Sequence, residues 1–155
     1  MGNTFQGSLS AEGFSFAVVV SKFNEDITFK MLDGAKKAFS DYHADCVDIA
    51  FVPGSVELPI AALKLAESGR YSAVVCIGVV VKGETDHYEH VATQAVSGIM
   101  QVSLESKIPC IMGVLTTVSM EQALDRAGGR EGNKGYEAAT TAVEMATLCN
   151  NIQSD

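Results

Sequence analysis

Four short apolar runs, separated by longer segments of helical periodicity, constrain the fold of this chain more than any other feature of its sequence. They are rich in Val and Ile and read FSFAVVV (14–20), CVDIAFV (46–52), AVVCIGVVV (73–81) and IPCIMGVL (108–115). The first and third runs lack the alternation of polar and apolar residues that marks a strand with one face in water. We therefore expect buried strands of a mainly parallel sheet.

Segments with helical periodicity fill the intervals between these runs and follow the last of them. They cover about 26–42, 56–68, 86–106, 119–127 and 134–149. The last two are separated by GGREGNKG (128–135), which contains too much glycine to remain helical. Strands that alternate with helices predict a three-layer αβα sandwich around a four-stranded, mainly parallel sheet.

The length of the chain fits a single domain over residues 1–155. No repeat, low-complexity tract or Pro/Ser-rich linker indicates a second one. The residues before the first strand, about 1–12, form an N-terminal arm that contains TFQGSLS (4–10). We expect this arm to supply an extra edge strand, and an exposed edge invites pairing with a neighbouring subunit.

Composition limits the function classes and the compartment. No stretch reaches the ~18 apolar residues of a membrane span, and the opening MGNTFQG lacks the basic and apolar regions of a signal peptide. The net charge of −8 argues against nucleic-acid binding, so an anionic substrate must be bound by a few locally placed cations. The four cysteines are spaced too widely for a metal knuckle or a redox pair, and we expect buried, reduced thiols in a cytoplasmic protein.

Polar loops follow all four predicted strands. They read SKFNEDIT (21–28), PGSVELP (53–59), KGETDHY (82–88) and TTVSMEQ (116–122). In open parallel sheets, ligands bind beyond the carboxyl ends of the strands. The sequence therefore predicts one site to which these loops contribute.

The third loop has the features of a phosphate-binding turn. Thr85 or Asp86 is a candidate N-cap of the following helix, with the backbone N–H groups of Glu84 and Thr85 directed outward. A helix terminus stabilises an exposed anion by only about 0.3–1 kcal/mol, whereas a charge-assisted hydrogen bond contributes about 1.5–3 kcal/mol. A phosphate site here should therefore recruit an Arg, and without one the loop reads equally well as an ordinary strand-to-helix turn.

His87 falls in the first turn of the helix that follows this loop. Histidine exchanges protons near neutral pH, which suits a general acid or base, although a histidine at a helix start is often only solvated or capping. His87 and His90 share a helical face, but zinc requires a third or fourth ligand that no other cluster supplies. We therefore expect no metal.

Each of the other candidate site residues can be interpreted either as a ligand-binding residue or as an ordinary structural one. Phe23 suits stacking on a flat heteroaromatic ring, or packing into the following helix. Glu57 suits hydrogen bonds from a polyol, or complements a helix dipole. Arg126 and Lys134 supply cations near a ligand, or are solvated residues at helix ends.

The combined pattern resembles the lumazine synthase family. The matching blocks occur in family order over about residues 8–149, and they read VVSKFN, VPGSVELP, CIGVVVKGETDHYEHV, GVLTT and EQALDRAGGREGNKGYEAATTAVEMATL. GETDHYE and RAGGREGNKG together are highly specific, whereas VPGSVELP alone is only moderately so.

This resemblance implies a flavodoxin-like sheet and a transferase of riboflavin biosynthesis that acts at its penultimate step. The family condenses 5-amino-6-(D-ribitylamino)uracil with 3,4-dihydroxy-2-butanone 4-phosphate to 6,7-dimethyl-8-ribityllumazine, and releases phosphate and water. The steps are imine formation, loss of phosphate and ring closure by the second amine. No metal or organic cofactor takes part.

The resemblance also assigns the pyrimidine ring and its ribityl chain to one group of residues. That group comprises Phe23, Ser55, Val56, Glu57, Val79, Val80, Val81 and Met112. Phe23 stacks on the ring, Glu57 binds hydroxyl groups, and the three valines of the strand present backbone groups.

The phosphate is assigned to the backbone amides of Glu84 and Thr85 together with Arg126, and proton transfer to His87. Asn24 and Lys134 lie near the same site. In the family, Arg126 and the residue at the position of Met112 come from the neighbouring subunit.

Three positions depart from common family residues. Val56 stands where many members carry an aromatic residue, Met112 stands where Phe is common, and Lys82 replaces a frequent Arg. These changes affect the packing of the pocket and substrate affinity more than the reaction.

The resemblance further implies a homo-oligomer, since family members form pentamers with active sites between subunits. Many assemble twelve pentamers into an icosahedral capsid. The turn GGREGNKG resembles the pattern of shell formers, with Arg130 where Lys is common, and favours a shell. Riboflavin synthase is a further partner implied in this way.

Three other functions compete with this one. An archaeal-type riboflavin synthase shares the fold but not the pairing of GETDHYE with RAGGREGNKG. A non-catalytic flavin- or lumazine-binding shell protein would have no need of His87 and Arg126. A flavodoxin-like electron carrier would require a Ser/Thr/Gly-rich phosphate loop where this chain has SKFNEDIT.

Overall fold

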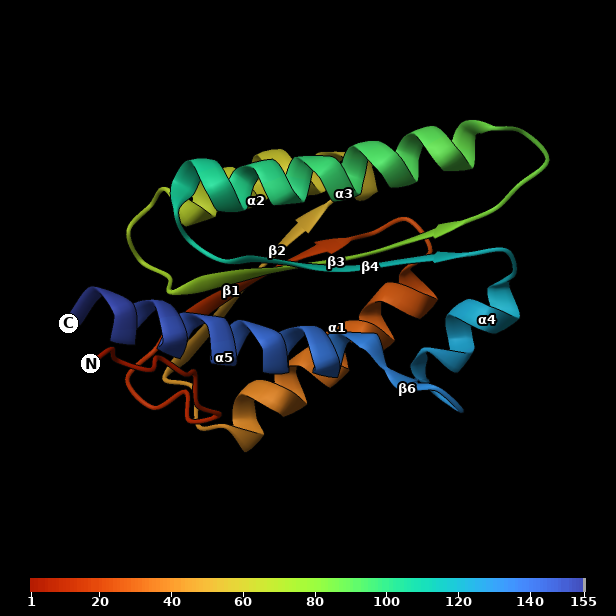
Figure 1. Ribbon diagram of the computed structural model, residues 1–155. Coiled ribbons are helices and arrows are strands. Elements are labelled where there is room, and N and C mark those ends of the chain that lie inside the picture. Colours follow the sequence, from red (N-terminus) through yellow and green to blue (C-terminus); the bar gives the residue numbers. More distant parts are fainter. Residues whose placement is uncertain (155) are drawn as a thin grey trace.

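A parallel sheet of four strands forms the middle layer of the computed structural model, which describes residues 1–154 (Figure 1). The strands are β1 (Ser15–Ser21), β2 (Cys46–Val52), β3 (Ala73–Val81) and β4 (Cys110–Thr117). Their order is β2-β1-β3-β4, and each neighbouring pair is parallel. The two uninterrupted apolar runs of the sequence thus form the two central strands, as expected for strands covered on both faces.

Helices cover both faces of the sheet. One face carries α1 (Glu25–Asp41) and α5 (Lys134–Ser154), and the other carries the 3-10 helix η1 (Ser55–Glu57), α2 (Leu58–Ala66) and α3 (His87–Ser106) (Figure 1). Between β4 and α5 the chain forms α4 (Met120–Asp125) and a small antiparallel hairpin of β5 (Ala127–Gly129) and β6 (Gly132–Asn133). Among the helices of the described residues, none combines the length and the apolar character needed to span a membrane.

Alternate residues of β1 belong to two separate hydrophobic cores. Phe16, Val18 and Val20 pack with α1 and α5, whereas Ala17 and Val19 pack with α2 and α3. The ring of Phe16 stacks on Phe39 of α1 with 4.6 Å between ring centroids. Complete burial of a side chain of this kind contributes about 1.5–3 kcal/mol, so both faces of the central strands stabilise the three-layer arrangement.

The predicted element boundaries differ from the observed ones by one or two residues at most ends, and α5 continues to Ser154 rather than ending near 149. The segment predicted as a helix over 56–68 begins as the 3-10 turn η1, and α2 starts only at Leu58. The last strand starts at Cys110 rather than at 108, directly after Pro109, which has no N–H to donate to a ladder. GGREGNKG holds the β5–β6 hairpin, whose two short strands the sequence did not predict.

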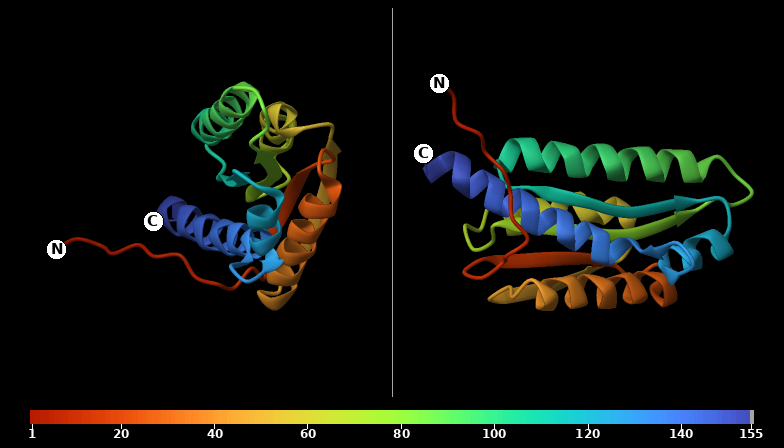
Figure 2. Two further views of the ribbon diagram at one scale, coloured as in Figure 1. Left: turned by 90° about the vertical axis from the view of Figure 1, so that its right-hand side faces the viewer. Right: turned by 60° about the horizontal axis from the view of Figure 1, so that its bottom comes forward.

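The N-terminal arm forms no strand within the described chain. Instead it crosses α5 and extends away from the body of the protein (Figure 2). The Ser8 N–H donates to Thr147 Oγ1 at 2.8 Å, and Asn151 Nδ2 donates to the Gln6 carbonyl at 2.8 Å. These bonds fix where the arm leaves the domain, while its pairing with a neighbouring subunit stays a prediction.

The cysteines are all free, and the predicted burial is right for two of them. Cys76 and Cys110 are buried, and burial raises the pKa of the Cys110 thiol to about 11. Cys149 is half-buried. Cys46 is exposed, contrary to expectation, because it opens β2 at the edge of the sheet.

Helices α1 and α5 approach each other closely enough to require glycine. A methyl group on Gly135 would lie 1.8 Å from the carbonyl oxygen of Met31 in α1. Asn133 fixes the same junction: its Nδ2 donates to the Lys30 carbonyl at 3.0 Å, and its Oδ1 accepts from the Gly135 and Tyr136 N–H groups at 2.8 and 3.1 Å. The start of α5 is therefore anchored to α1 by backbone contact.

Replacing Gly135 by Ala should lower the free energy of unfolding by about 1–3 kcal/mol or more, because the added methyl overlaps backbone that cannot move aside easily. Denaturant-induced unfolding of both proteins measures the difference. Gly2→Ala is the matched control, since a methyl there meets no atom within 4 Å. Equal stability of the Gly135→Ala and Gly2→Ala variants would contradict the close approach of the two helices.

Candidate functional site

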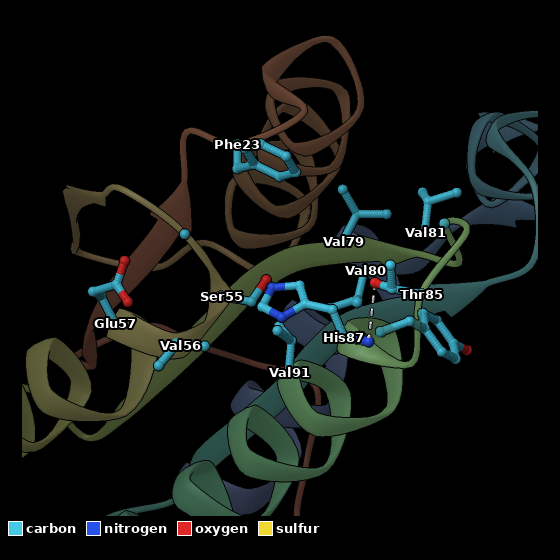
Figure 3. Close-up of a pocket in the computed structure, with 13 residues that line it drawn as sticks. Phe23, Ser55, Val56, Glu57, Val79, Val80, Val81, Thr85, His87 and Val91 are labelled. Carbon is cyan, nitrogen blue, oxygen red and sulfur yellow. Dashed lines mark hydrogen bonds between the residues drawn. The ribbon is translucent and has the colours of Figure 1, made fainter.

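A pocket of about 360 Å³ lies at the carboxyl ends of β1 and β3 (Figure 3). Three of the four polar loops predicted to converge contribute to it, together with the end of β3 and the first turns of α3. Its lining residues are Phe23, Gly54, Ser55, Val56, Glu57, Val79, Val80, Val81, Gly83, Thr85, His87, Tyr88 and Val91. The predicted convergence is thus confirmed for the loops that follow β1, β2 and β3.

Backbone hydrogen bonds join the first two of these loops. The Lys22 N–H donates to the Val52 carbonyl at 2.8 Å, and the Phe23 N–H donates to the Pro53 carbonyl at 3.1 Å. This extension of the β1–β2 ladder places the ring of Phe23 across the pocket from η1. The Phe23 side chain remains 69% exposed, so its ring is free to cover a ligand rather than being packed into α1.

The end of β3 forms the floor of the pocket. The ladder between β1 and β3 ends at the pair Val20↔Ile77, whereas the ladder to β4 continues to Val81↔Thr117. Val79–Val81 therefore have a strand partner on the β4 side only. Their backbone groups on the β1 side are available to a ligand in the pocket.

The turn before α2 supplies one wall. Ser55 is buried at 6% exposure, Val56 is exposed, and Glu57 is half-buried. Figure 3 shows the Ser55 hydroxyl on the pocket side and the Glu57 carboxylate farther from the strand end. The wall thus combines hydrogen-bonding groups with a small apolar side chain.

His87 stands at the opposite wall, in the first turn of α3. Its imidazole points into the pocket on the Ser55 side (Figure 3), and within residues 1–154 it makes no side-chain hydrogen bond. The backbone N–H of His87 donates to Thr85 Oγ1 at 3.4 Å. Asp86 occupies the N-cap position without a side-chain cap, so Thr85 rather than Asp86 approaches the free amides of the helix.

The turn between β3 and α3 leaves its amides free. Within the described chain, the backbone N–H groups of Glu84 and Thr85 donate no hydrogen bond to another residue. Gly83 and Thr85 line the pocket, whereas Glu84 is exposed and does not. Free amides beside a helix start form a binding site for an anion.

Asn24 lies just outside the pocket. It caps α1 with a left-handed backbone (φ 59°), and its side chain makes no capping bond. Its supporting role in the site stays a prediction.

The remaining predicted residues line a second hollow of about 360 Å³ beside β4. Its lining residues are Met112, Val114, Leu115, Thr116, Thr117, Arg126, Glu131, Lys134 and Glu137. The two hollows share no residue. The half-buried Arg126 donates from Nη1 to the Gln122 carbonyl at 3.0 Å and pairs with no carboxylate in the described residues. Within one chain, Met112, Arg126 and Lys134 thus line a different hollow from His87.

Four residues of the pocket were not predicted. Gly54 and Gly83 lie within the loops identified from the sequence, but glycine carries no side chain that signals a site. Tyr88 and Val91 belong to the apolar face of α3, which periodicity assigns to the core. No three His, Cys, Asp or Glu side chains of residues 1–154 are grouped closely enough to hold a metal ion.

One protein family matches the chain over residues 13–150, and it is described as 6,7-dimethyl-8-ribityllumazine synthase. The match covers most of the 155 residues and includes every residue that lines either hollow. Only the N-terminal arm and the last residues of α5 lie outside it.

Proposed function

The chain belongs to the 6,7-dimethyl-8-ribityllumazine synthase family, transferases of riboflavin biosynthesis, and we propose that it catalyses the condensation at the penultimate step of that pathway. The substrates are 5-amino-6-(D-ribitylamino)uracil and 3,4-dihydroxy-2-butanone 4-phosphate. The products are 6,7-dimethyl-8-ribityllumazine, phosphate and water. One observation carries the proposal: a ring-binding wall, a strand end with free backbone groups and an anion-binding turn surround one pocket, with His87 between them.

The pyrimidine lies between Phe23 and the end of β3. The ring of Phe23 stacks on it, and the backbone groups of Val79–Val81 that lack a strand partner bind its edge. The ribityl chain extends along the opposite wall, where the Glu57 carboxylate accepts hydrogen bonds from its hydroxyl groups and the Ser55 hydroxyl can donate or accept. Val56 widens this wall, because it is smaller than an aromatic side chain.

The phosphate of the second substrate binds at the turn before α3. The free N–H groups of Glu84 and Thr85 donate to its oxygens, and the Glu84 carboxylate stays in solvent. In this position the butanone carbon chain lies next to the amines of the pyrimidine, beside His87.

His87 moves the protons of the reaction. After the 5-amino group and the ketone have formed an imine with loss of water, a proton leaves the adjacent carbon as phosphate departs. His87 accepts this proton and returns it to the terminal carbon of the resulting enol, which becomes a methyl ketone. The ribitylamino nitrogen then attacks this ketone carbonyl, and loss of a second water closes the ring. Because no carboxylate or carbonyl of the described chain binds its imidazole, both ring nitrogens are accessible to the substrate.

A second copy of the chain completes the site. Arg126 supplies the cation that an acidic chain needs to bind phosphate, yet it lines a different hollow from His87 of the same chain. A neighbouring subunit that places its Met112 and Arg126 against the first pocket brings these groups together. We propose that five chains form a pentamer with sites at its subunit interfaces, and that twelve pentamers form an icosahedral shell. The N-terminal arm pairs with the neighbour's sheet.

Purified protein mixed with both substrates should produce the lumazine faster than the same mixture without protein. The increase in absorbance of the product measures this rate. The control is needed because the two substrates also condense slowly on their own. No acceleration by a fully assembled protein would contradict the proposal and would favour a non-catalytic flavin- or lumazine-binding shell.

Replacing Arg126 by Ala should raise the KM for the phosphate substrate about 10- to 100-fold, as expected for loss of a charge-assisted hydrogen bond. The KM for the pyrimidine should change little. Arg130→Ala is the matched control, since Arg130 pairs with Asp125 on the surface at 2.9 Å and lines neither hollow. An unchanged KM in Arg126→Ala, or an equal rise in Arg130→Ala, would remove Arg126 from the phosphate site.

A further inference from the structure

The hydroxyl of Ser21 lacks a partner within the fold. Among the described residues, Ser21 Oγ is the one buried side-chain oxygen or nitrogen that makes no hydrogen bond, and the residue is 0% exposed. Its backbone carbonyl is used, because it accepts from Thr28 Oγ1 at 2.7 Å. A buried hydroxyl without a partner destabilises the folded state, so its presence requires an explanation.

Ser21 faces the side of the sheet that carries the pocket wall. Side chains alternate along a strand, and the alternate residues Ala17 and Val19 pack in the core formed with α2 and α3. Ser21 continues this series at the last position of β1. Its hydroxyl therefore lies on the side of η1, beneath the wall that contains Ser55.

Gly78 brings Ser21 and Ser55 to neighbouring positions. The last pair of the β1–β3 ladder is Val20↔Ile77, so Ser21 lies beside Gly78, one residue farther along. A methyl on Gly78 would lie 2.6 Å from Ser55 Oγ, which means that the Ser55 hydroxyl occupies the space that a side chain at Gly78 would take. The Ser55 hydroxyl thus covers Gly78, and Ser21 is the β1 residue that follows the last paired position on the same face of the sheet.

We propose that Ser21 is a positioning residue for the ring-binding wall and acts through Ser55. With the pyrimidine in the pocket, the Ser55 hydroxyl donates to a ligand oxygen, and its own oxygen accepts a hydrogen bond from Ser21. In the structure Ser21 Oγ makes no bond to Ser55. Rotation of the Ser55 side chain toward the ligand brings its oxygen to Ser21, so ligand binding gains the free energy of a second hydrogen bond.

The inference rests on the proposed function, since it takes the ligand to be a pyrimidine or lumazine. The test therefore uses 6,7-dimethyl-8-ribityllumazine and measures binding by the change in its fluorescence, independently of turnover. Ser21→Ala should raise the dissociation constant about 2- to 10-fold, which corresponds to the net free energy of one hydrogen bond. The melting temperature of the ligand-free variant should be unchanged or higher, because the variant removes an unsatisfied group.

Thr147→Val is the matched control. Thr147 is also a buried hydroxyl, at 6% exposure, but it is bonded to Ser8 and Val143 far from the pocket. This variant should lower the melting temperature and leave the dissociation constant unchanged. Ser21→Ala is thus expected to change the dissociation constant and Thr147→Val the melting temperature. These opposite effects distinguish a positioning role from a structural one.

A double-mutant cycle with Ser55→Ala tests the path from Ser21 to the ligand. Ser21→Ala should have no further effect on the dissociation constant once Ser55 is Ala. An unchanged dissociation constant in Ser21→Ala, a lowered melting temperature with unchanged binding, or equal effects in both backgrounds would overturn the inference. Failure of the unsubstituted protein to bind the lumazine would contradict the proposed function itself, and this inference with it.

Discussion

Burial of a parallel sheet on both faces is the constraint on which the rest of this structure depends. It requires the interior of β1 and β3 to be apolar, so the polar residues of these segments lie at the strand ends and in the loops that follow them. Since parallel strands end at the same edge, Phe23, the Ser55 wall and the turn before α3 meet there. The pocket is thus a consequence of the strand order, and the overhang of β3 beyond β1 gives it free backbone groups.

The charge distribution is the reason why the proposed site requires a second copy of the chain. A protein of net charge −8 must concentrate cations to hold a phosphorylated substrate, yet the pocket around His87 is lined by no Lys or Arg. Arg126 and Lys134 line the hollow beside β4: Arg126 is the C-cap of α4, Lys134 opens α5, and the Lys134 N–H donates to the Arg126 carbonyl at 2.8 Å across the β5–β6 hairpin. Under the proposed function, the two halves form one site only between subunits, so that catalysis would depend on assembly.

The sequence predicted the fold and the pocket through local signals. Uninterrupted Val-rich runs identified the central strands, and the loops after β1, β2 and β3 identified Phe23, Glu57 and His87. Ser55 was assigned only through the family resemblance. Three features depend on contacts between distant segments and were not predictable: the β5–β6 hairpin, the junction fixed by Asn133, and the orphan hydroxyl of Ser21. The exposed Cys46 was misjudged because the edge position of β2 is a property of the whole sheet.

The proposed division of the site between subunits is tested most directly by mixing two variants, each of which lacks one of the two residues that the site requires. His87→Ala and Arg126→Ala chains are co-expressed with different tags, and mixed oligomers are assayed at a phosphate-substrate concentration below its KM. Random assembly across one kind of head-to-tail interface leaves about one site in four with both residues intact, so about a quarter of the unsubstituted rate should return. A mixture no more active than the average of the two variants alone would contradict a site shared between copies.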